Sequence, residues 1–503
     1  MTERISRILG AGMLLVLGLS PCAVSAQAPE LLELYEDRTL HSVLDALPDS
    51  MFDQLSLEEQ LLHLRAEARG ARGYHAVEQI RPLLAAHRNH PAVLATAAVV
   101  HHAAGRLDEA ARLARAALDL DPGQVAAWRA DAMLRLHRHD PVGALASFRE
   151  ARRADPSRVG SFWDVLFGQS IAEGLGEAAV RADALEARAA VHEAAGHPDR
   201  AGDARERAAL SRLVSGLPLF TAETDADVVV VPFDACFDGT PYRCVDVHAG
   251  GERYRVLIDS GNEYGFGVHS GALQDALATY TGGATSVTTG SVDTALVARD
   301  FFADRVDFGG LTLRHVPAVA SPKIREPYWD ANLNPFFIRH RVVTLDYVTG
   351  RMIVRTRARF DRDLATADHP VARVPMYDPD RPYIMADVNG RRATAVIETG
   401  AEVLSLTAEF AEHAGLPLRD GTRQWRDRVL DVRRTDANVT VGGVPFFRDS
   451  VEAWPGRVGD LCTGLLYDVV IGPGSLEGRF SLSYDPIDRV VILERGPAAG
   501  VGP

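Results

Sequence analysis

The chain has 503 residues, which at about 100–200 residues per domain is too long for one core and suggests about three units. Its content of 47% hydrophobic and 24% charged residues is that of a folded globular protein, which excludes wholesale disorder and a polytopic membrane protein. The net charge of −14, from 54 basic and 68 acidic residues, repels phosphate backbones, so we expect no nucleic-acid partner.

The first residues predict a signal peptide over 1–28. Two arginines precede an apolar stretch at 8–19, and small residues then continue to Ala28. This stretch is too short for a comfortable membrane span, and no later run approaches about twenty apolar residues, so we expect no transmembrane segment in the mature chain. Because Pro21 precedes Cys22, this cysteine is a poor site for a lipid anchor. We expect a periplasmic or secreted protein.

Three cysteines remain after cleavage of the signal, and two of them lie close together in the sequence. Cys236 and Cys244 flank the turn-rich stretch 238–241, which would allow them to pair in an oxidising compartment. Two unpaired thiols are the alternative, and the sequence leaves both open.

Residues 30–215 are rich in Ala, Leu, Arg and Glu and predict helices. Small and turn-forming residues recur here with a spacing of 34: Ala110, Ala117 and Pro122 return as Ala144, Ala151 and Pro156. With Trp128 and Phe148 expected to fill the seam between paired helices, the segments 91–124 and 125–158 resemble tetratricopeptide (TPR) repeats. The resemblance implies a helical solenoid whose concave face binds a protein partner. A generic helical bundle is the alternative.

After Pro218 the sequence changes to short Val/Ile/Leu-rich alternations interrupted by Gly, Pro and Asp, which predict an all-β region. Landmarks in this region occur twice, at nearly constant offset. The run 256–261 returns at 395–400, and the run 306–310 returns at 439–443. We therefore predict two similar lobes, over 226–357 and 371–495, joined by a polar segment at 358–370.

The strongest landmark is a strand that ends in an acid, a hydroxyl residue and a glycine. The triplets are Asp259-Ser260-Gly261 in the first lobe and Glu398-Thr399-Gly400 in the second. The strand delivers a carboxylate to a turn, the hydroxyl can bond across an interface, and the glycine can donate its N–H to the acid. If the lobes meet about a pseudo-twofold axis, the carboxylates lie side by side. One of them is then protonated, and the pair can activate a water.

The β region resembles the retropepsin-like aspartic proteases of bacteria. Besides the triplets, the likeness rests on these segments: Val388-Asn389-Gly390, a helix at 407–415, a hairpin at 441–443, Val470-Ile471-Gly472 and Asn334-Pro335-Phe336-Phe337. The resemblance implies an α plus all-β chain, with a helical repeat domain before two pepsin-like β-barrel lobes. It implies a polypeptide substrate, no cofactor and no metal. The site residues are then the catalytic pair Asp259 and Glu398, their supports Ser260, Gly261, Thr399 and Gly400, and a flap glycine at Gly290.

Two departures from the family pattern bear on activity. Glu398 stands where the family has aspartate, and its extra methylene moves the carboxylate by more than an ångström unless the backbone yields. Misplacement on this scale costs about a hundredfold in rate. The stretch Ala331–Asn334 also replaces the hydrophobic-hydrophobic-glycine element that supports the acid turn. The sequence therefore predicts an exported aspartic-type endopeptidase, with a degenerate, peptide-binding scaffold as the alternative.

Overall fold

The computed structural model describes residues 31–32, 40–69, 73–175, 177–262, 264–289, 292–321, 328–365, 371–378, 381–425, 428–454 and 466–496. The predicted signal peptide with Cys22, and the expected flap residue Gly290, lie outside these ranges. None of the helices within them combines the length and the apolar character that crossing a membrane requires.

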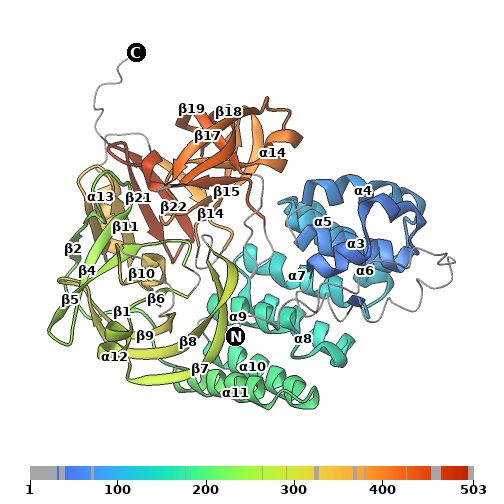
Figure 1. Cartoon of the computed structure of the whole chain (residues 1–503), viewed down its shortest axis with the longest axis horizontal. Helices are drawn as coiled ribbons and strands as arrows, with labels where there is room; N and C mark the ends of the chain where they lie inside the picture. The colour runs from blue at the N-terminus through green and yellow to red at the C-terminus, as the bar shows by residue number, and fades with distance from the viewer. Residues whose placement is uncertain are drawn as a thin grey trace, which may run out of the picture.

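The N-terminal part is helical and is followed by a β-rich part. Figure 1 shows the helices as an arc along the right and lower sides of the strands. The helices are α2 (Leu40–Ala46), η2 (Asp49–Gln54), α3 (Leu57–Arg69), α4 (Gly73–Ala86), α5 (Pro91–Ala103), α6 (Leu107–Leu120), α7 (Val125–His137), α8 (Pro141–Ala154), η3 (Pro156–Arg158), α9 (Phe162–Leu175), α10 (Ala178–Ala194) and α11 (Pro198–Leu213).

Two consecutive helix pairs follow the 34-residue spacing found in the sequence. Helices α7 and α8 each begin 34 positions after α5 and α6. Phe148 is 2% exposed and joins the helical core, as expected for a seam residue. Trp128 was expected beside it but lies only half-buried, because its indole N–H donates to the Pro122 carbonyl at 2.8 Å at the start of the helix. The seam is filled mainly by alanines, whose small side chains allow close helix packing.

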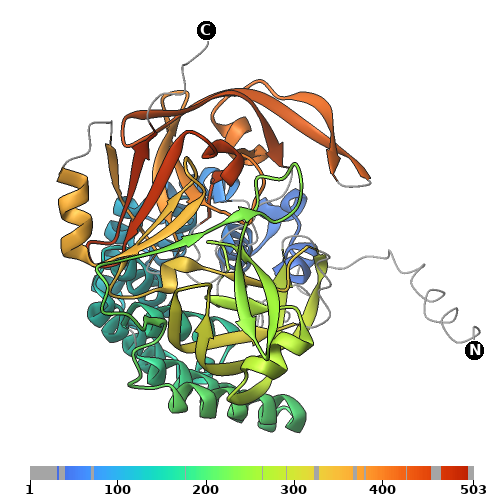
Figure 2. The ribbon, with the colours of Figure 1, turned by 90° about the vertical axis from the view of Figure 1, so that its left-hand side faces the viewer.

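The strands of the described residues form three sheets. The first large sheet contains β1 (Thr221–Ala222), β3 (Asp234–Ala235), β4 (Arg243–Ala249), β5 (Glu252–Ile258), β6 (Phe266–Val268), β7 (Tyr280–Thr289), β8 (Val292–Asp307), β9 (Thr312–Ala320) and β10 (Ala331–Leu333). The second contains β14 (Tyr383–Val388), β15 (Arg391–Ile397), β16 (Ser405–Thr407), β17 (Arg419–Trp425), β18 (Arg428–Val441), β19 (Val444–Trp454) and β20 (Val469–Ile471). Figure 2 shows the green and yellow strands of the first below the orange and red strands of the second.

The two large sheets have the same strand order. The path β4-β5-β10-β6-β9-β8-β7 in the first corresponds to β14-β15-β20-β16-β19-β18-β17 in the second. The directions agree as well, since β5 with β10 and β15 with β20 are parallel, as are β6 with β9 and β16 with β19. Short helices follow the same strands, α12 (Gly271–Leu277) after β6 and α14 (Ala408–His413) after β16.

A third sheet takes strands from both halves of the β region. Its order is β13-β22-β21-β11-β12-β2, with β2 (Val228–Pro232), β11 (Val342–Asp346), β12 (Arg351–Arg355), β13 (Val371–Pro375), β21 (Phe480–Asp485) and β22 (Val490–Arg495). At its centre Thr344 pairs with Ser483, and their hydroxyls lie 2.7 Å apart. The polar segment expected to join the lobes, 358–370, begins within helix α13 (Arg357–Ala365), whose Phe360 is buried with Val342 and Ile492. Two further short helices, η4 (Pro335–Phe337) and η5 (Pro473–Ser475), follow β10 and β20.

The helical region packs directly on the β-rich part. Asp300 of β8, 2% exposed, accepts hydrogen bonds from Arg181 at 2.8 Å and from Arg207 at 3.1 Å, on helices α10 and α11. At the other end, Glu409 of α14 accepts from the backbone N–H groups of Tyr74 and His75, at 2.9 and 3.1 Å. The arc of helices therefore contacts both large sheets.

Of the two alternatives for the cysteines, the structure has the disulfide between Cys236 and Cys244. It joins the paired strands β3 and β4, which lie next to β5 in the first large sheet.

Candidate active site

The two acid triplets stand at equivalent strand ends. Strands β5 and β15 become buried toward their carboxyl ends, and Asp259 and Glu398 are the first residues after them. Each acid residue is held by the neighbouring parallel strand. The N–H of Asp259 donates to the Leu333 carbonyl at 2.8 Å, and the N–H of Glu398 donates to the Ile471 carbonyl at 3.0 Å.

The hydroxyl residues of the triplets bind each other's backbone across the junction of the two sheets. The Ser260 N–H donates to Thr399 Oγ1 at 2.8 Å, and the Thr399 N–H donates to Ser260 Oγ at 2.9 Å. Each hydroxyl also donates to a carbonyl of the opposite strand, Ser260 to Ile397 at 2.6 Å and Thr399 to Ile258 at 2.9 Å. Both residues are at most 1% exposed, so these bonds are shielded from water.

This exchange brings the two carboxyls together. The N–H of Gly261 lies 3.1 Å from Asp259 Oδ1 and also 3.1 Å from Glu398 Oε1. Glu398 Oε1 accepts a second bond from the N–H of Gly400 at 3.0 Å. A single backbone donor thus serves both acids, which places one oxygen of each in the same small space despite the longer glutamate side chain.

Both triplets require glycine for steric reasons. A Cβ at Gly261 would overlap the Glu398 carboxyl, and a Cβ at Gly400 would lie 2.5 Å from Asp259 Oδ1. No larger residue fits at either position without moving a carboxyl group. The glycines therefore determine how closely the acids approach.

The surroundings favour a protonated Glu398. Burial raises its pKa well above the ordinary value of 4.5, and the nearby Asp259 charge and a hydrogen bond to Asp259 raise this pKa further. The Gly400 N–H and Arg381 lower this pKa, but they offset only part of the rise. When Glu398 holds the proton, the pair of carboxyls carries one negative charge. The pair can then both accept and donate a proton.

Asn332 is a site residue that the sequence reasoning did not identify as functional. Its side-chain amide donates to Asp259 Oδ2 at 2.7 Å, and its own Oδ1 lies 3.2 Å from His269 Nε2. The stretch Ala331–Asn334 lacks the glycine of the family pattern. Its first three residues form β10 beside β5, and Asn334 Nδ2 donates to the Ser260 carbonyl at 3.0 Å. A polar residue at the centre of an otherwise apolar strand was the available signal.

A long antiparallel strand pair stands in each large sheet, and the expected flap at Gly290 stays a prediction. Strands β7 and β8 pair from Tyr280 to Thr289, and the connection that contains Gly290 lies outside the described residues. Strands β17 and β18 form the corresponding hairpin of the second sheet. The backbone pairing thus provides a hairpin in each half of the β region.

A group of side chains that could hold a metal ion occurs elsewhere, in the helical region, at Asp49, Glu67 and His75. It lies on η2, α3 and α4, and none of its residues belongs to the acid triplets.

No protein-family model matches the chain, and no curated protein matches it. Among solved structures, the chain is similar to the crystal structure of a retropepsin-like aspartic protease from Rickettsia conorii. The identity is 21%, the match covers 25% of this chain and 91% of that chain, and the TM-score is 0.20.

Proposed function

We propose that the chain is an exported aspartic-type endopeptidase that hydrolyses peptide bonds with the Asp259/Glu398 pair. The observation that carries this proposal is the single Gly261 N–H shared by the two carboxyls, one from each half of the β region. The common strand order of the two large sheets supports two tandem lobes of one origin, 226–357 and 371–495, neither of which has a complete site alone.

In the proposed reaction, a water molecule bound between the carboxyls attacks the peptide carbonyl. Asp259, held as the anion by Asn332 and by the Gly261 N–H, accepts a proton from this water. Protonated Glu398 donates its proton to the carbonyl oxygen, which gives a neutral tetrahedral intermediate. Asp259 then gives the proton it accepted to the amide nitrogen, a hydroxyl of the intermediate returns a proton to Glu398, and the C–N bond breaks to leave an amine and a carboxylic acid. Gly261, Gly400, Ser260 and Thr399 hold the two acids in place and do not react.

The extra methylene of Glu398 favours a second candidate function, a peptide-binding scaffold without hydrolysis. Its chain is longer, but its Oε1 still reaches the Gly261 N–H, which Asp259 also uses. This contact favours the peptidase.

The helical repeats, which we propose are of the TPR type, would hold a protein substrate or partner on the face not packed against the lobes.

Export is part of the proposal. The predicted signal over 1–28 would direct the chain to the periplasm or the outside of the cell. The Cys236–Cys244 disulfide supports this location, because disulfides persist in oxidising compartments.

The test is cleavage of an unfolded protein by the mature chain between pH 4 and pH 7, with and without a peptide inhibitor that carries a transition-state-mimicking hydroxyl. We expect inhibitable cleavage that Asp259→Asn abolishes, whereas Asp304→Asn, the same change at an exposed position, leaves it intact. Binding of the inhibitor without any cleavage would support the scaffold. Cleavage that survives Asp259→Asn would refute the catalytic role of the pair.

A further inference from the structure

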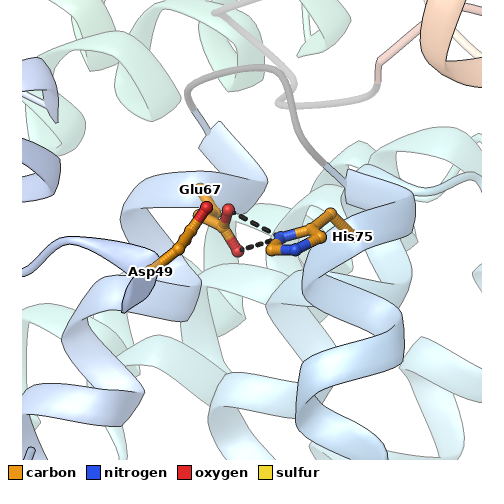
Figure 3. Close-up of side chains that lie close together, drawn as sticks. All are labelled: Asp49, Glu67 and His75. Carbon is orange, nitrogen blue, oxygen red and sulfur yellow. Dashed lines mark hydrogen bonds and ion pairs between the residues drawn. The ribbon is translucent and has the colours of Figure 1, made fainter. Parts of the chain in front are cut away.

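A compact group of histidine and carboxyl side chains lies in the first helices, apart from the catalytic pair. It consists of Asp49 on η2, His63 and Glu67 one turn apart on α3, and His75 in the first turn of α4. Figure 3 shows the Asp49 and Glu67 carboxyls and the His75 ring facing one another between these helices. The sequence showed no such pattern, because three separate elements supply the residues.

The ligand atoms of Asp49, Glu67 and His75 lie close enough together to close around a small divalent cation, and His63 adjoins the two carboxylates. One ligand atom each from Asp49, Glu67 and His75 lies within 4.8 Å of the others. His63 Nε2 is 3.1 Å from Asp49 Oδ1 and 3.5 Å from Glu67 Oε2. Tetrahedral zinc has ligands at about 2.0–2.1 Å, and therefore at about 3.3 Å from one another.

The orientation of His63 is an independent observation that points to a metal ligand. Its Nδ1 lies 2.6 Å from the Leu47 carbonyl, which can only accept, so Nδ1 carries the hydrogen and the neutral ring has its lone pair on Nε2. The residue is 1% exposed, yet Nε2 makes no hydrogen bond within the described part of the chain. Two carboxylate oxygens, Asp49 Oδ1 and Glu67 Oε2, lie beside Nε2 at 3.1 and 3.5 Å.

This arrangement is typical of a metal-ligating histidine. Such a histidine usually donates its other ring N–H to a backbone carbonyl or a carboxylate, which fixes the tautomer. Its lone pair points to the metal, between the other ligands, and not at any one of them. The contact of His63 with Leu47 supplies the first feature, and the unbonded Nε2 between two carboxylates supplies the second.

Charge and access also fit a bound cation. Glu67 is fully buried and has a second carboxylate, Asp49, beside it, so a divalent cation would neutralise two like charges. The side chains of Asp49 and His75 are 39% and 36% exposed, which leaves a route for the ion from solvent. Two imidazoles with two carboxylates suit zinc better than magnesium or calcium, which prefer oxygen ligands alone.

We propose that Asp49, His63, Glu67 and His75 form a structural zinc-class metal site. His75 Nδ1 now donates to Glu67, at 2.9 and 3.1 Å from its two oxygens. On binding, the ring proton of His75 moves to Nε2, and Nδ1 becomes the fourth ligand. Because the backbone N–H groups of Tyr74 and His75 bind Glu409, the metal would fix the turn of α4 that contacts helix α14.

The test uses the mature chain without an affinity tag, freed of metal with EDTA and titrated with Zn²⁺ alone. We expect one saturable site per chain, a higher melting temperature with Zn²⁺, and no response to Mg²⁺. His63→Gln and His75→Gln should each weaken Zn²⁺ binding at least tenfold, whereas His87→Gln, at an exposed position after α4, should not.

Binding of cobalt(II), followed by its visible absorption, is a second measurement. It keeps the proposal testable if the His63 variant folds poorly. Intense visible absorption bands of tetrahedral cobalt are expected with the parent chain and with His87→Gln, but not with His75→Gln, whose partly exposed ring can be replaced without opening the core. Absence of a saturable zinc site would overturn the proposal, as would unchanged zinc affinity in both His63→Gln and His75→Gln.

Discussion

Ser260 and Thr399 exchange backbone hydrogen bonds, each donating its N–H to the other's hydroxyl oxygen at 2.8 and 2.9 Å. The bonds are reciprocal because the two residues occupy equivalent positions after equivalent strands, β5 and β15. Both are buried, so the junction cannot replace these bonds with water. This exchange fixes the two triplets relative to each other, and thereby the spacing of Asp259 and Glu398.

Thr399→Val should destabilise the chain, because valine has the shape of threonine but no hydroxyl. The Ser260 N–H and the Ile258 carbonyl would lose their partner, at a cost of about 1–3 kcal/mol for each buried group. Thr399→Ser, which keeps the hydroxyl, is the control and should cost less. The measurement is the free energy of unfolding in urea. Equal stability of the two variants would show that the exchange contributes little.

Glu398→Gln should change how stability depends on pH. The raised pKa of Glu398 means that the folded chain holds this proton more tightly than the unfolded chain, so the parent loses stability as the pH rises above about 4.5 toward that pKa. The glutamine variant has no such loss and should gain in melting temperature relative to the parent over this interval. If the melting temperatures of the parent and of Glu398→Gln changed in parallel from pH 4 to pH 8, the raised pKa would be contradicted.

The same shift predicts the pH dependence of cleavage. Activity requires the proton on Glu398, so kcat should remain high above pH 4.5 and fall only as the pH passes the raised pKa. A pH profile of kcat measures this. A fall that is complete near pH 4.5 would show that Glu398 is not the group that donates the proton.

Asn332→Leu should lower kcat about 10- to 100-fold, because one hydrogen bond to a charged group contributes about 1.5–3 kcal/mol. The amide positions the Asp259 carboxyl for the reaction, so KM should change little and the loss should fall on kcat. Asn438→Leu, the same change at an exposed strand position, is the control. A rise of KM equal to the fall of kcat, or an equal loss of kcat in Asn438→Leu, would contradict this positioning role.

Asp300→Asn should loosen the contact between helices α10 and α11 and the β7–β8 hairpin. Although burial alone would raise the pKa of Asp300, Arg207 and Arg181 lower it below its ordinary value of 3.8. The ion pairs therefore stabilise the chain above pH 3.8, and this contribution is lost as the pH falls through the lowered pKa.

Breaking this buried group should cost about 3–5 kcal/mol at neutral pH. Asp304→Asn, which breaks an exposed pair with Arg314, should cost much less, because water screens exposed ion pairs. Thermal unfolding at pH 7 compares the two variants. Similar melting temperatures would show that the helices and the hairpin do not depend on Asp300.

The sequence by itself determined the order of the elements and the positions of the acids. The 34-residue spacing placed α5 to α8, because alternating small and apolar residues specify helix pairs locally. The repeated strand-acid-hydroxyl-glycine pattern placed Asp259 and Glu398 at equivalent strand ends, because a strand and its turn are encoded by adjacent residues.

Only the tertiary structure decided which groups meet. The shared Gly261 N–H, the bond from Asn332 to Asp259 and the approach of His63 to Asp49 each join residues on different elements. Contacts of this kind depend on how sheets and helices pack, to within about an ångström, and no local pattern records that packing. The sequence likewise left the pairing of Cys236 with Cys244 undecided, and the pairing of β3 with β4 decides it by bringing the two cysteines together.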